Sequence, residues 1–151
     1  MALDITGILD KVVSHAAGVG YFEQVNGHEP ASAPGYGLTA AVWSERVTPV
    51  RSSGLASLST LLVFSVRIYT SAHQEPMDAI DPRMVEAVDA LCREYAGDFT
   101  LGGLVRHVDL LGAAGQPLDV RAGYISQDGS LYRVMTITLP VIVNDLWEEA
   151  P

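Results

Sequence analysis

Few residues of this 151-residue chain are spaced so that they could do chemistry together. The clearest pair is His107 and Asp109, which flank Val108 in an apolar stretch. In a strand these two side chains would share one face and could form an acid–base pair or two metal ligands. No third ligand can be named, so we favour the alternative of a solvated polar face on a half-buried strand.

The other reactive residue types point away from catalysis. The single cysteine, Cys92, lies on the apolar side of a predicted helix, where burial would leave the thiol inert. The chain has no P-loop, no dinucleotide-binding glycine motif, no His-Glu-x-x-His and no Gly-x-Ser-x-Gly. We therefore expect a binding or structural protein with no enzyme activity, no catalytic residue, no metal and no cofactor.

Several carboxylates surround the same predicted helix. Asp81 is placed to cap its first turn, and Asp89 to pair with Arg93 at i,i+4. A solvated helix face accounts for the group, and a cation site or an acidic channel wall stays open as the alternative. The carboxylates are Asp78, Asp81, Glu86, Asp89 and Glu94.

Two helices and six strands are expected, in the order α-β-β-β-α-β-β-β. Apolar residues at three- and four-residue spacing predict a helix over 4–17, capped by Asp4 and ended by a left-handed Gly18, and a second over 81–97. The apolar face of the second helix comprises Met84, Val85, Val88, Leu91, Cys92 and Tyr95. Strands are predicted at 20–25, 38–48, 59–71, 104–111, 118–126 and 131–143. This pattern predicts one α+β domain over 1–151, with an antiparallel or mixed sheet of five to six strands covered by two helices on one face.

Some strands carry more specific signals. Both faces of 59–71 are partly apolar, which is typical of a central strand. The turn at Asp128-Gly129 predicts a hairpin that places Ile125 opposite Tyr132. Pro49 should close the second strand, and Pro140 should restrict the last strand to an edge or a bulge. Loops are expected near 26–37 and 49–58.

Charge and hydropathy exclude further classes. The formal charge is −9 and the pI is about 4.6, which argues against a protein whose main function is to bind nucleic acid. The longest apolar run, 61–66, is far shorter than the roughly 20 residues of a membrane-spanning helix. No basic segment precedes an apolar one at the start, so the cytosol is the expected compartment. Eight of the nine basic residues are Arg, which fits a GC-rich genome or, alternatively, interface pairing.

The C-terminal half resembles the tail terminator (tail completion) proteins of siphophages that infect actinobacteria. The likeness covers about residues 60–147, and the first 60 residues match only in the order of elements. It rests on Asp81-Pro82, Val88–Leu91, Tyr95–Gly112, Ala122–Ile125 and Tyr132–Asp145.

This resemblance implies a virion protein that forms a homo-hexameric ring. The ring caps the head-proximal end of the tail tube, stops tube polymerisation and offers a surface to the head-tail connector or head-closure protein. It implies assembly in the host cytoplasm, a final place at the head–tail junction, DNA only in passage through the lumen, and no membrane. The alternatives are another neck component, such as a head-closure or connector protein, and a small acidic enzyme using His107 and Asp109.

Under this hypothesis the loop 49–58 contacts the tube or a neighbouring subunit, and the alternative is a mobile surface loop without such a contact. Flanking arginines would pair with carboxylates across the interface, and a tryptophan near the end would be an interface anchor or a core lid. The predicted interface residues are Arg46, Arg51, Ser52, Ser53, Gly54, Leu55, Arg67 and Trp147.

Overall fold

Two long strands, β3 (Ser57–Ser71) and β6 (Ser130–Glu148), form the central pair of a six-stranded sheet. The computed structural model describes residues 3–28, 37–50, 57–73 and 77–148. The other elements are α1 (Ile5–Gly18), β1 (Gln24–Asn26), β2 (Thr39–Val50), the 3-10 turn η1 (Met77–Ala79), α2 (Ile80–Gly97), β4 (His107–Val108) and β5 (Asp119–Gln127). Their order is the predicted one.

The sheet is mixed. Strands β1, β2, β3 and β6 lie side by side, and both β4 and β5 pair with the far side of β6. The β1–β2 pair is parallel and the other pairs are antiparallel. The α+β fold class is confirmed, as is the central position predicted for 59–71.

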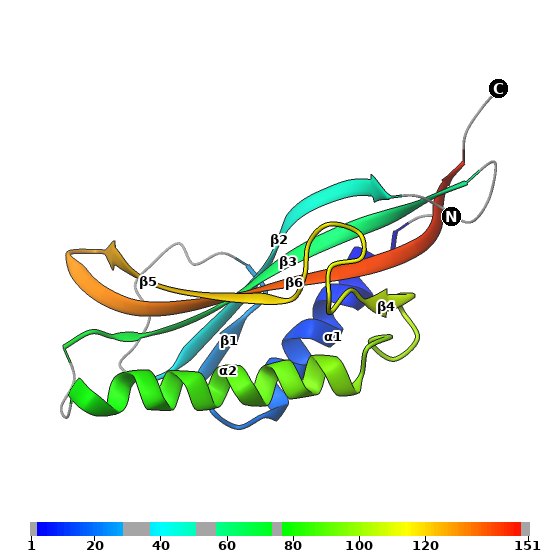
Figure 1. Cartoon of the computed structure of the whole chain (residues 1–151). Coiled ribbons are helices and arrows are strands. Elements are labelled where there is room, and N and C mark those ends of the chain that lie inside the picture. Colours follow the sequence, from blue (N-terminus) through cyan, green and yellow to red (C-terminus); the bar gives the residue numbers. More distant parts are fainter. Residues whose placement is uncertain (1–2, 29–36, 51–56, 74–76, 149–151) are drawn as a thin grey trace.

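Both helices cover the same face of the sheet (Figure 1). Helix α1 buries Ile8, Val12 and Ala16 completely, at the spacing expected of one helical stripe. Helix α2 buries Met84, Ala87, Leu91 and Tyr95, and these side chains pack on alternate residues of the central strands in one hydrophobic core. Within the described residues, neither helix is long and apolar enough to cross a membrane.

The β5–β6 hairpin forms in the predicted register. Ile125 pairs with Tyr132 and Tyr124 with Arg133. The turn residues Asp128 and Gly129 have φ of 52° and 78°, which is the left-handed conformation that a two-residue hairpin turn requires.

Helix ends differ from the prediction in two places. Gly18 remains helical, and the left-handed residue is Gly20, with φ of 79°. Asp81 does not cap α2, because η1 leads directly into the helix and Ala79 occupies the cap position without a side-chain hydrogen bond. Asp4 does cap α1, accepting from the Gly7 N–H at 3.0 Å.

One residue of the predicted apolar face of α2 lies outside the core, because the Val85 side chain is 52% exposed.

Segment 104–111 is mostly turn rather than strand. Leu101, Gly102 and Gly103 all have positive φ, so the chain winds through consecutive turns before it reaches the sheet. Only His107 and Val108 then pair with β6. The first strand is also shorter than predicted, at three residues.

Both prolines predicted to limit strands lie inside them. Pro140 is in the central strand β6, and its carbonyl accepts from the Asp109 N–H at 2.9 Å. Because the N and O atoms of one antiparallel residue point to the same side, its ring nitrogen faces the part of β6 beyond the Asp119–Thr138 pair, which is the first pair that β5 makes. Pro49 lies in β2 and pairs with Thr60 of β3. The other side of β2 has no strand partner at Pro49 among the described residues.

Candidate functional site

The sheet face opposite the helices carries an arginine stacked on an aromatic ring. The Arg67 guanidinium carbon lies 5.2 Å from the centre of a Trp43 ring, and Arg67 Nε donates to Thr136 Oγ1 at 2.9 Å. These residues come from the neighbouring strands β3, β2 and β6. Because Val66 packs under the helices and side chains alternate along a strand, Arg67 points to the opposite face.

A β-bulge brings a carboxylate into this group. The β2–β3 register shifts between Ser44 and Arg46, and Glu45 Oε1 there accepts from Trp43 Nε1 at 3.2 Å and from Ser65 Oγ at 3.1 Å. The indole therefore has its N–H bound and an arginine over a ring face. Fixed tryptophan and arginine side chains of this kind are enriched in protein–protein interfaces.

Arg46 lies on the same face as this group. It pairs with Val63 in the β2–β3 ladder, is exposed, and forms no ion pair with any residue that the structure describes. Its guanidinium is therefore an exposed positive charge on this face. Arg46, Arg67 and their neighbours Trp43 and Glu45 are called the Trp43 face below.

The remaining predicted interface residues are not all brought together. Arg67 does not flank the loop 49–58, because it lies ten residues along β3 from Ser57, about 33 Å at strand spacing. Trp147 is 40% exposed opposite Leu58, at the end of the sheet where β2 stops and β3 starts. Arg51, Ser52, Ser53, Gly54 and Leu55 lie outside the described residues.

The predicted pair of His107 and Asp109 has a structural explanation. Strand β4 ends at Val108, and Asp109 is only 3% exposed. Its two carboxylate oxygens accept from the N–H groups of Ala113 and Ala114, both at 2.9 Å. The interpretation as a solvated polar strand face is therefore wrong, and the carboxylate is occupied in holding a turn. His107 lines an open pocket beside it.

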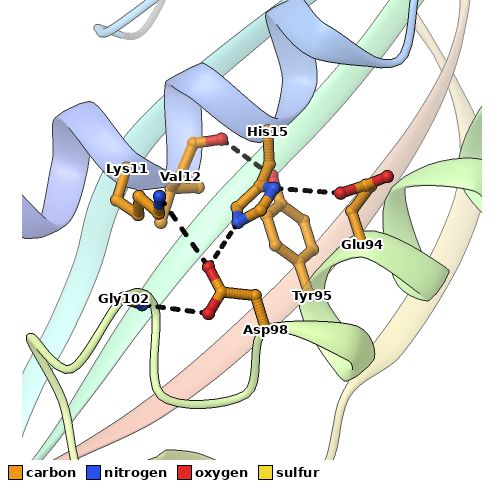
Figure 2. Close-up of polar contacts among 7 residues, drawn as sticks. All are labelled: Lys11, Val12, His15, Glu94, Tyr95, Asp98 and Gly102. Carbon is orange, nitrogen blue, oxygen red and sulfur yellow. Dashed lines mark hydrogen bonds and ion pairs between the residues drawn. The ribbon is translucent and has the colours of Figure 1, made fainter.

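A polar cluster that the sequence does not reveal joins the two helices (Figure 2). His15 of α1 lies between two carboxylates, with Nε2 2.8 Å from Asp98 Oδ2 and Nδ1 3.2 Å from Glu94 Oε2. Lys11 Nζ lies 4.0 Å from the same Asp98 oxygen. Figure 2 shows the imidazole pointing from α1 toward the end of α2.

Asp98 is held in its charged form. The Gly102 N–H donates to Asp98 Oδ1 at 3.0 Å, and this bond and then the bond from His15 lower the pKa of the Asp98 carboxyl from its usual value. Both ring nitrogens of His15 are occupied by carboxylates, so the cluster is a link between helices and does not present a free base.

Tyr95 forms a second link beside the first. Its hydroxyl donates to the Val12 carbonyl at 3.1 Å, and its ring meets the His15 ring edge to face at 5.8 Å. Burial raises the pKa of the Tyr95 hydroxyl well above its usual value. This link is therefore neutral and is kept over the whole ordinary pH range.

The other groups considered for chemistry are occupied or shielded. Burial, and then the nearby Asp89, raises the pKa of the half-buried Cys92 thiol, which keeps it protonated. Asp89 forms the predicted ion pair with Arg93 at 3.1 Å. In the part of the chain that the structure describes, no three His, Cys, Asp or Glu side chains are placed to hold a metal ion.

Comparison with models of known protein families gives no match, and comparison with curated proteins gives none either.

Proposed function

We propose that this chain is a structural subunit of a phage tail terminator ring. Six copies form a closed ring on the head-proximal end of the tail tube, stop its polymerisation and receive the head connector. The proposal rests on the sequence resemblance over residues 60–147, and the Trp43 face is the structural observation that supports it.

The resembling stretches fold into one connected part of the molecule. They make up α2, the turns before β4, and the strands β4 to β6. The helices cover only one face of this sheet (Figure 1). A closed ring needs a heterologous contact, in which one surface of a subunit meets a different surface of the next. The Trp43 face and the exposed side of α2 are two such surfaces.

The charges of these two surfaces suit each other. The Trp43 face presents Arg46, which has no ion pair with a described residue. Helix α2 carries four carboxylates against two arginines of its own, and Arg133 of β6 pairs with one of these carboxylates, so the helix keeps a small net negative charge. Opposite charges on facing surfaces favour the correct contact and disfavour others.

The net charge supports passage of DNA through such a ring. Each subunit carries −9, and phosphates are repelled by carboxylates that line a channel. At physiological salt this repulsion reaches only about 8 Å. It therefore acts only where acidic side chains face the lumen.

Native mass spectrometry and electron microscopy of the purified chain, with and without tail tubes, test the proposal. We expect a hexameric mass, or one that appears when tubes are added, and density at the tube end that receives the head. Tubes whose length is unchanged when the protein is left out of assembly would contradict a terminator. Density against the portal instead would indicate a head-closure protein.

The surface is tested by one charge reversal. Arg46→Glu should abolish the ring while leaving the unfolding midpoint within experimental error of the wild type, because Arg46 is exposed. Arg46→Lys is the matched control, since it keeps the charge and should still assemble. A ring that forms normally with Arg46→Glu would exclude the Trp43 face as a subunit contact.

A further inference from the structure

The His15 cluster is built so that its full bonding depends on one proton. A neutral imidazole has one N–H donor and one acceptor nitrogen, whereas the imidazolium has two donors. Both ring nitrogens of His15 face carboxylate oxygens, which only accept while ionised. Both hydrogen bonds can therefore form together only when His15 is protonated.

The surrounding charges point the same way. The groups that face His15 are Lys11 from its own helix, and Glu94, Tyr95 and Asp98 from α2. With a protonated His15 the cluster holds two positive and two negative groups, because Tyr95 stays neutral. Loss of the second ring proton leaves the cluster with one uncompensated negative charge. The nitrogen that loses the proton then directs its lone pair at the carboxylate it had bonded.

The cluster lies where α1 is attached to the rest of the fold. His15 is on the third turn of α1, next to Val12 and Ala16, which are completely buried. The imidazole itself has a side-chain exposure of 14%. The Tyr95–Val12 bond in the same turn does not titrate, so it holds α1 in place at every ordinary pH. Loss of the proton should therefore loosen the end of α1 without releasing the whole helix.

We propose that His15 is a proton-dependent clamp that fixes the C-terminal half of α1 to the end of α2. The clamp is closed when the imidazole is protonated and bonds both carboxylates, and it opens when the ring gives up its second proton. This proposal does not depend on the proposed function, because it concerns the isolated fold.

Hydrogen–deuterium exchange of the full chain between pH 5.5 and 8.0, corrected for intrinsic exchange rates, tests the clamp. We expect protection of amides 12–18 to fall about two- to fivefold with rising pH, the size expected of a partly exposed ion pair. The amides around Ile8 should change less. Unchanged protection of 12–18 across this range would overturn the proposal.

Two variants separate the clamp from general destabilisation. His15→Gln should remove the pH dependence, and Glu94→Gln should reduce it by leaving only the Asp98 partner. Glu94 is the cleaner site, because Asp98 also binds the Gly102 N–H. His73→Gln is the control, since His73 is exposed and forms no ion pair with a described residue. A pH dependence that persists in His15→Gln would assign it to another group.

Nitrogen chemical shifts of the His15 ring give a readout that folding alone does not move. We expect both ring nitrogens to be protonated at pH 5.5 and one to lose its proton as protection of 12–18 falls. A ring that is already neutral at pH 5.5 would contradict the clamp.

Discussion

Arg133 and Asp81 join the β5–β6 hairpin to the first turn of α2 through two hydrogen bonds. Arg133 Nε lies 2.9 Å from Asp81 Oδ1, and Nη2 lies 3.2 Å from Oδ2. Donating to Asp81 raises the pKa of the Arg133 guanidinium, which is charged in any case. Arg133 also lies over the Tyr124 ring, 4.6 Å from its centre. One side chain thus connects a strand, a helix and the far strand of the hairpin.

We expect Arg133→Lys to destabilise the fold by about 1 kcal/mol, because a lysine cannot make the two parallel bonds and stack on the ring. Urea unfolding measures this change. Arg121→Lys is the control, since Arg121 is exposed and bonds Asp119 through only one nitrogen. Equal stability of the Arg133 and Arg121 variants would show that the two-bond geometry contributes little.

Replacement of Asp109 should destabilise the fold, because its carboxylate holds a turn. Asp109→Ala leaves the N–H groups of Ala113 and Ala114 without their acceptor, which should cost about 2–3 kcal/mol. Chemical unfolding measures the loss. His107→Ala should change stability far less, because His107 makes no hydrogen bond to Asp109 in the described structure. An equal loss of stability in His107→Ala would show that His107 and Asp109 act together.

Tyr95 should resist alkaline ionisation. Its raised pKa means that the folded state binds the hydroxyl proton more tightly than the unfolded state does. Its stabilisation is therefore complete below the unfolded pKa of about 10 and is lost as the pH rises above it. Tyr95→Phe should lower stability by about 1 kcal/mol at neutral pH by removing the bond to Val12.

Tyrosinate absorbance checks this prediction. While the protein is folded, wild type and Tyr95→Phe should show the same alkaline absorbance change, because Tyr95 does not contribute. A difference should appear only when the chain unfolds. A wild-type signal that exceeds that of Tyr95→Phe in the folded state would contradict the burial of the hydroxyl.

Two glycines in the loop before β5 provide a matched pair. Gly112 and Gly115 both have positive φ, at 77° and 107°. A Cβ on Gly112 would lie 2.8 Å from the Pro117 nitrogen, whereas a Cβ on Gly115 would meet nothing within 4 Å. Both alanine variants carry backbone strain, so we expect Gly112→Ala to be the less stable by about 1–3 kcal/mol through the added overlap. Thermal unfolding compares them, and similar midpoints would mean that the Pro117 segment moves easily.

The sequence predicts those parts of the fold that local chemistry decides. Asp128-Gly129 determines the hairpin and its register because few other residue pairs adopt that turn. Gly18 and Gly20 illustrate the limit, since both suit a helix end and the sequence does not show that Gly20 takes the left-handed position. Pro140 is a similar case, because its place in a central strand depends on where β5 begins.

The helix-joining cluster could not be predicted in the same way. His15 meets residues that are 79 and 83 positions away, and the sequence shows only a histidine on a helix. Arg67 and Trp43 are likewise brought together by the β2–β3 register. Such contacts follow from how the elements pack, and a single sequence contains no signal for them.

The position of β6 has a consequence for how the chain acquires its structure. Among the described residues, strands β4 and β5 pair with β6 and not with β3, and β6 is the last of these strands to be synthesised. Until β6 is made, β3 lacks one of its two neighbours and its apolar side chains have no complete sheet. The native sheet can therefore close only after β6 has been synthesised, by a pairing between distant segments, which is slow compared with local folding. During that interval the nascent chain exposes unpaired strand edges, which are the surfaces through which partly folded chains aggregate.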